Sequence, residues 1–177
     1  TAKDLILHVI GEIGVAGATY RSMEFCGSVV EELSIEQRLT LCNMAIEAGG
    51  KSGIVAPDDK TRAYMDGRAK RDIRFYESDA EATYHSRYQW SVDEIDLQIA
   101  CPYSPDNVKP ISEVEGIAVD QVFIGSCTNA RLEDLRIAAH IMKGRKLAPY
   151  LRCIVIPATH EVYRQAAREG LIETFME

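Results

Sequence analysis

The chain has 177 residues, 46% of them hydrophobic and 27% charged, which is the composition of an ordinary soluble globular protein. Its formal net charge of −7 argues against a duplex nucleic acid as partner, because binding to the phosphate backbone needs a surplus of basic side chains. No apolar run approaches the roughly 20 residues of a membrane-spanning helix, and no pattern of a signal peptide occurs, so we expect neither.

Helical and extended patterns alternate through the first half of the chain. Apolar residues from Leu5 to Ile13 share one helical face, and Ser34 with Gln37 fits the capping box that opens a second helix. Gly49 and Gly50 end that helix. The predicted elements are a helix over 3–13, a strand over 20–26, a helix from 34, a strand at 53–55, a helix over 60–65, an exposed loop over 68–82, and strands over 84–90 and 95–100.

A proline-rich stretch separates the two halves. Pro102, Pro105 and Pro110 fall within nine residues beside Ser, Asp and Asn, which is typical of a linker or a domain boundary. We therefore expect one domain over residues 1–100, and a linker with part of a second domain over residues 101–177.

The second half has the order strand, turn, helix, strand, helix. The predicted elements are a buried strand over 121–124, a turn at 125–129, a helix over 132–142, a strand over 152–156 and a helix over 160–169. This order predicts an α/β fold with a parallel sheet covered by helices.

The five cysteines are widely spaced and odd in number, which predicts reduced thiols in a cytoplasmic protein. No CxxC or CxxxC pair occurs, so the chain by itself is not expected to hold a complete zinc or iron–sulfur ligand set. The chain begins at Thr1 rather than Met, and its last residues read as an unfinished helix, so we expect it to be cut from a longer protein. The cysteines are Cys26, Cys42, Cys101, Cys127 and Cys153.

Cys127 is the sharpest chemical feature. It lies between Gly125 and Asn129, at the carboxyl end of a predicted strand and just before a helix, where open α/β sheets place their ligands. Amide N–H groups and the helix dipole there favour a thiolate, the form that binds iron or attacks an electrophile. From position alone, a small buried cysteine in a tight turn is an equally good interpretation.

Asn43 and Glu47 form the second candidate feature. They are four residues apart on the helix that starts at Ser34, so both side chains project from one face. An amide and a carboxylate on one face can bind a hydroxyl group and its water. Taken alone, however, such a pair is more often an exposed helical surface.

Two long motifs resemble those of the aconitase superfamily of hydro-lyases. Residues 122–129 (VFIGSCTN), followed by Glu133–Arg136, are similar to the family's cluster-cysteine motif, and Thr40–Gly49 with Gly53–Asp58 is similar to its second motif. Residues Gly144–Pro149 resemble the isopropylmalate and homocitrate branch. The resemblance runs in order along the whole chain.

The resemblance implies three-layer α/β/α domains with mostly parallel sheets, arranged around a [4Fe-4S] cluster. Residues 1–100 would be the second domain of a large subunit, and residues 101–177 the start of the third, cluster-bearing domain. Cys127 matches one of three cluster ligands, while the other two belong to a CxxC motif expected downstream. Asn43 and Glu47 match residues beside the cluster, and Cys26 and Cys42 match no ligand position, so both are expected to be core thiols.

The implied reaction isomerises a hydroxy di- or tricarboxylic acid, of the 3-isopropylmalate or homocitrate type, by removing water and adding it back. Glu47 would face the substrate hydroxyl or its water, and a small swivelling subunit would supply the base that takes the carbon-bound proton. Because a single thiolate cannot hold the cluster, we expect the 177 residues alone to lack both cluster and activity. Their exposed apolar faces also favour a homodimer of the fragment.

Two other functions fit the sequence without the resemblance. One is a cysteine-nucleophile enzyme in which Cys127 attacks and His160 is the base. The other is a non-catalytic interaction module that associates with partner subunits.

Overall fold

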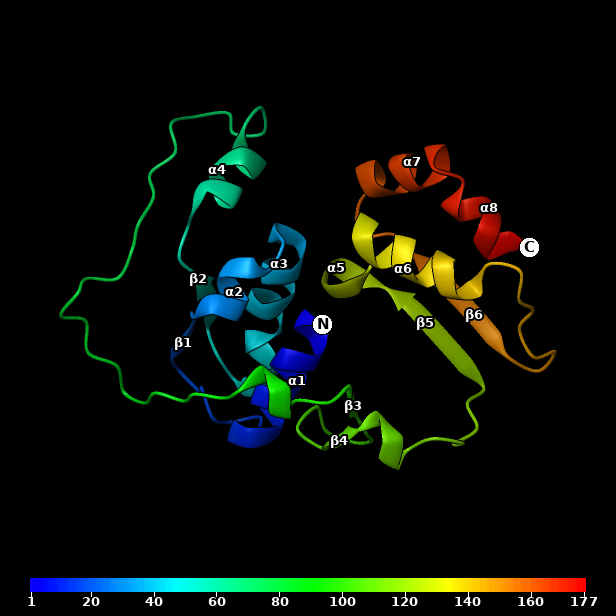
Figure 1. Cartoon of the computed structure of the whole chain (residues 1–177), viewed down its shortest axis with the longest axis horizontal. Helices are drawn as coiled ribbons and strands as arrows, with labels where there is room; N and C mark the ends of the chain where they lie inside the picture. The colour runs from blue at the N-terminus through cyan, green and yellow to red at the C-terminus, as the bar shows by residue number, and fades with distance from the viewer. The chain divides into compact units, whose positions relative to one another are not determined.

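The computed structural model describes all 177 residues and divides into two compact units, Thr1–Glu115 and Gly116–Glu177. Both are mixed α/β, with one parallel strand pair in each (Figure 1). The first unit comprises α1 (Ala2–Ile13), β1 (Ser22–Phe25), α2 (Ser28–Glu32), α3 (Ile35–Met44), the 3₁₀ helix η1 (Ala45–Ala48), β2 (Ser52–Val55), α4 (Asp59–Met65), η2 (Val92–Glu94), β3 (Gln98–Ala100), β4 (Val108–Pro110) and η3 (Ile111–Glu113). The second comprises β5 (Gln121–Gly125), α5 (Ser126–Asn129), α6 (Leu132–Met142), β6 (Arg152–Ile156), α7 (His160–Arg168) and α8 (Leu171–Met176).

The core of the first unit lies between α1, α3 and the parallel pair β1–β2. Ile6 and Ile10 of α1 are completely buried, and Leu41 of α3 packs in the same cluster. Burying each such side chain contributes about 2 kcal/mol. The start of α1 is fixed by a capping box in which Asp4 also accepts a 2.9 Å hydrogen bond from the Gln98 amide of β3.

A glycine sets the distance between α3 and β2. A Cβ atom on Gly53 of β2 would lie 2.5 Å from the Cα of Cys42 and 2.8 Å from its carbonyl oxygen. Only glycine allows the strand to approach the helix backbone this closely. The contact fixes the height of α3 over the sheet.

In the second unit, the helices cover one face of the parallel pair β5–β6. Leu135 and Ala166 are completely buried there, against Ile124 and Val155 of the strands. Side chains alternate along a strand, so those of the other positions point away from the helices. The strand expected to be buried is therefore half exposed, and Phe123 remains 53% exposed.

The strand expected over residues 84–90 does not exist, since this segment has no neighbouring strand to pair with. Its alternating aromatic residues pack by ring contacts instead. Tyr88 stacks on Trp90 with ring centroids 5.6 Å apart, and the rings of Trp90 and His8 of α1 form a T-shaped pair with centroids 5.8 Å apart. The strand expected over 95–100 is reduced to β3.

The proline-rich stretch folds as part of the first unit. Val108–Pro110 forms β4, which pairs antiparallel with β3, and the Cys101 amide donates a 2.8 Å hydrogen bond to the Asn107 carbonyl. The two compact units accordingly divide after Glu115, later than the linker expected from sequence. No helix combines the length and apolar character that crossing a lipid bilayer requires.

Candidate functional site

Asn43 and Glu47 stand near the end of α3, whose start is set by the expected capping box. The Gln37 amide donates to the Ser34 hydroxyl and the Ser34 amide donates to the Gln37 side chain, each at 3.1 Å. Both reciprocal bonds are therefore present, so the helix begins where the sequence predicts.

The helix does not continue as a regular α-helix to Glu47. It tightens into η1 at Ala45, because Gly49 takes a left-handed conformation and the Gly50 amide bonds back to the Ala45 carbonyl at 3.0 Å. Asn43 and Glu47 are both exposed. The regular α-helix that the sequence predicts as far as Glu47 therefore ends at Met44, and Glu47 lies in the 3₁₀ turn.

Cys127 lies in α5, a single helical turn at the carboxyl end of β5. Gly125 is buried and extended, and Ser126 then adopts a positive φ of 75°, which is uncommon for a residue other than glycine. The thiol is exposed, so the interpretation of Cys127 as a buried core cysteine is wrong. The helix α6 begins at Leu132, as the sequence predicts, and the turn expected at 125–129 contains the short helix α5.

The turn after Cys127 is anchored by Asp134 of α6. The Asp134 carboxylate accepts hydrogen bonds from the Arg131 amide at 3.1 Å and the Asn129 side-chain amide at 3.3 Å. The Arg131 guanidinium donates to the Thr128 carbonyl at 2.9 Å. These hydrogen bonds were not predicted from the sequence. An acidic residue three positions after Arg131, in the first turn of a helix, was the signal that could have indicated them.

The exposed thiol can be one ligand of a metal cluster but not the whole set. No group of three or more His, Cys, Asp or Glu side chains gathers anywhere in the chain as a metal site. The Oδ1 atom of Asn129, close in sequence to Cys127, is buried without a hydrogen-bond partner. A buried oxygen without a hydrogen bond destabilises the fold unless a bound group or a water donates to it. The surroundings of Cys127 therefore fit a binding site to which further groups contribute.

The remaining cysteines differ in exposure. Cys42 is half buried, and burial raises the pKa of its thiol, as expected for a core residue. Cys26 is exposed, so the expectation that it is a core thiol is wrong. It directly follows Phe25, the last residue of β1.

A charged junction fixes α2, α3 and α4 at the opposite end of α3 from Asn43. Arg38 is 4% exposed and donates to Asp58 at 2.6 Å and to the Glu31 carbonyl at 2.7 Å. Asp58 also caps α4 through the Thr61 amide. The hydrogen bond from Arg38 lowers the pKa of the Asp58 carboxyl well below its usual range.

His160, considered as a base for Cys127, is exposed at the start of α7. It belongs to the same compact unit as Cys127, whereas Asn43 and Glu47 belong to the first unit.

Comparison with known proteins covers the whole chain. The model of the Aconitase family (aconitate hydratase) matches residues 1–116 and 108–177. The chain is 57% identical over 180 residues to the 3-isopropylmalate dehydratase large subunit of Aquifex aeolicus (strain VF5), covering 99% of the chain and 42% of that relative. It is 53% identical over 179 residues to 3-isopropylmalate dehydratase large subunit 1 of Pyrococcus furiosus, covering 100% of the chain and 42% of that relative. The chain thus spans about two fifths of the length of these curated relatives, and it belongs to the aconitase family.

Proposed function

We propose that this chain is part of the large subunit of an iron–sulfur hydro-lyase that isomerises 3-isopropylmalate or a closely related hydroxy acid. The observation that carries the proposal is an exposed cysteine in a strained turn at the end of β5, within a chain 57% identical to a 3-isopropylmalate dehydratase large subunit. In this proposal Cys127 is one ligand of a [4Fe-4S] cluster whose other ligands come from outside these 177 residues.

The wider arrangement follows from the same proposal. The two units correspond to parts of two three-layer α/β/α domains of the family, and a small subunit completes the enzyme, as the name of the relatives suggests. None of the five cysteines forms a disulfide, which suits a reducing compartment such as the cytoplasm.

Each candidate residue has a defined task. A bound cluster would supply a Lewis acid for the leaving hydroxyl. The Glu47 carboxyl group is exposed and can exchange a proton with that hydroxyl or the water that replaces it. The Asn43 amide offers both a donor and an acceptor to orient the same group. The 3₁₀ turn closed by Gly49 holds the backbone of Glu47 in place.

The test uses the full-length large subunit assembled with its small subunit. We expect Glu47→Gln to lower kcat about 10²- to 10⁴-fold, because the amide can no longer exchange the proton. The matched control is Glu32→Gln, which changes an exposed carboxylate in α2 and should leave kcat as in the wild type. Equal activity of the two variants would remove Glu47 from the reaction.

A further inference from the structure

The irregular segment between α4 and η2 separates its charges into two adjoining blocks. The basic block, Arg68–Arg74, has four cationic side chains and one carboxylate, for a net charge of +3. The acidic block, Glu77–Glu81, has three carboxylates and no cation, for a net charge of −3. Every charged side chain of both blocks is exposed. Between the blocks lie Phe75 and Tyr76, and Tyr76 is 75% exposed.

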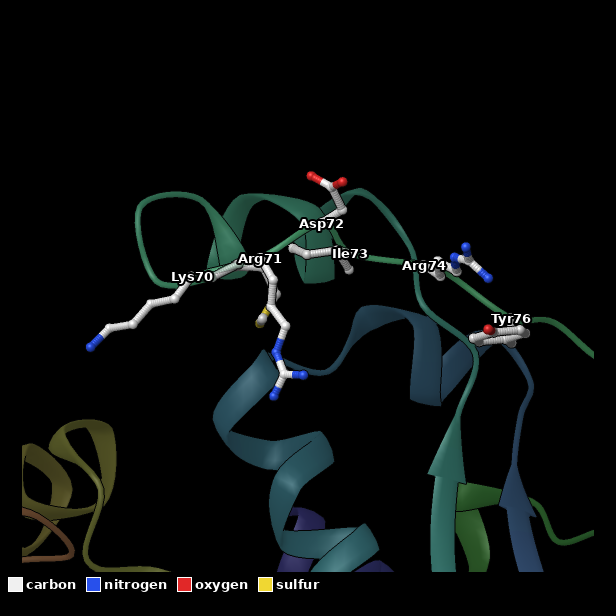
Figure 2. Close-up of a pocket in the computed structure, with 8 residues that line it drawn as sticks. Lys70, Arg71, Asp72, Ile73, Arg74 and Tyr76 are labelled. Atoms are coloured by element: carbon white, nitrogen blue, oxygen red, sulfur yellow. The ribbon is translucent and has the colours of Figure 1, made fainter.

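The two blocks do not neutralise each other within the chain. None of the ion pairs joins a residue of one block to a residue of the other. Figure 2 shows that the charged ends of Lys70, Arg71 and Arg74 point in different directions around an open depression. Because these cations diverge, they do not form a site for one small anion. They suit a partner that is itself extended.

The segment is attached to the first unit at several points. The Glu24 carboxylate of β1 accepts hydrogen bonds from the Ser78 hydroxyl at 2.9 Å and the Tyr84 hydroxyl at 2.7 Å. The Arg62 guanidinium of α4 lies 4.2 Å from the centre of the Phe75 ring. These contacts hold the acidic block and Phe75 in place on the surface, which reduces the conformational entropy that a partner would have to remove on binding.

We propose that residues 68–81 form a docking surface for a second copy of this chain. In the dimer, the basic block of one copy lies along the acidic block of the other, about a twofold axis near Tyr76. A twofold axis reverses the order of the blocks, so the sequence positive, aromatic, negative is complementary to itself. A uniformly acidic or basic partner would instead meet one block of its own sign.

The chemistry of the surface sets the strength of the dimer. Exposed ion pairs contribute little individually, and the aromatic pair at the centre is small, so the association is weak and depends on salt. We expect a dimer at protein concentrations of about 0.1 mM in about 0.01 M salt, and a monomer in about 1 M salt.

Charge reversal tests the pairing by sedimentation equilibrium of the 177-residue chain. Variant A carries Lys70→Glu, Arg71→Glu and Arg74→Glu, and variant B carries Glu77→Lys, Asp79→Lys and Glu81→Lys. Each alone places like charges opposite each other, so each is expected to be monomeric in low salt. An equimolar mixture of A and B is expected to form a heterodimer, since the two acidic blocks of variant A then face the two basic blocks of variant B.

A control variant separates this effect from net charge. Asp93→Lys, Glu113→Lys and Glu115→Lys make the same change in charge as variant B on exposed positions outside the blocks, and should leave the dimer intact. A wild-type chain that is monomeric in low salt overturns the proposal. So does a dimer that persists in about 1 M salt or in variants A and B, because it would then be held by other surfaces.

Discussion

Replacing Gly53 by alanine tests the close approach of β2 to α3. The new Cβ would lie 2.5 Å from the Cα of Cys42 and 2.8 Å from its carbonyl oxygen, whereas carbon atoms in contact prefer about 3.5–4.0 Å. The neighbour is helix backbone, which cannot turn aside as a side chain can, so strand and helix must separate by about 1 Å. Overpacking of this kind costs about 3 kcal/mol.

The assay is urea unfolding followed by the fluorescence of Trp90, the one tryptophan of the chain. Trp90 lies in the first unit against Tyr88 and His8, so its emission reports the unfolding of that unit. With a typical denaturant slope, the loss corresponds to a midpoint lower by about 1.5 M urea.

The matched control is Gly67→Ala. Gly67 has a φ of 66°, and no atom lies within 4 Å of the place that a Cβ would take there, so the variant costs only the left-handed backbone conformation, about 1 kcal/mol. If Gly53→Ala unfolds at the same urea concentration as Gly67→Ala, the close contact does not restrict the first unit and the reasoning is refuted.

Two further predictions concern the second unit and the charged junction. Leu135→Ala should destabilise the second unit by about 3 kcal/mol because Leu135 is completely buried, and amide hydrogen exchange should show the loss in residues 116–177 while the Trp90 transition stays unchanged. The folded pKa of Asp58 is lowered by its hydrogen bond from Arg38, so its contribution to stability is present above the ordinary carboxyl pKa and is lost as the pH falls below about 4. Asp58→Asn should therefore be less stable than the wild type at about pH 7, and the difference should shrink towards about pH 2. An equal difference at both values would contradict this.

The sequence predicted the bounds of helices correctly where these depend on residues that are close together in the chain. The capping pattern of Ser34 and Gln37 correctly placed the start of α3, and Gly49 ends the 3₁₀ helix η1 that follows it, whereas the end of α3 itself at Met44 was not predicted. The helix α2 was missed because it is a single turn without apolar periodicity. Its last carbonyl groups accept hydrogen bonds from a residue distant in sequence: the Lys60 ammonium donates to the Glu31 carbonyl at 2.7 Å and to the Glu32 carbonyl at 2.9 Å.

Pairing between distant segments was not available from the sequence. The alternation over residues 84–90 looks like a strand, but a strand needs a partner, and this segment has ring contacts instead. In the same way, the prolines around Ser104 suggested a linker, whereas the antiparallel pairing of β3 with β4 makes the proline-rich stretch part of the first unit.

The place of Cys127 in the fold was predicted from the sequence, but the local geometry around it was not. The sequence placed Cys127 at the end of a strand, and β5 does end at Gly125. It carried no sign of the positive φ at Ser126, whereas the acidic residue three positions after Arg131 was a local signal for the bonds by which Asp134 holds the following turn. The sequence also gave no indication that the α-helix changes to a 3₁₀ helix before Glu47.

The most direct test of the account is the iron content of the full-length protein after anaerobic reconstitution with iron and sulfide. Cys127→Ser is compared with Cys26→Ser, which removes another exposed thiol. We predict that the wild type and Cys26→Ser bind about four iron atoms and absorb near 400 nm, and that Cys127→Ser loses most of both. A Cys127→Ser protein with the iron content and absorbance of the wild type would contradict the assignment of Cys127 as a cluster ligand.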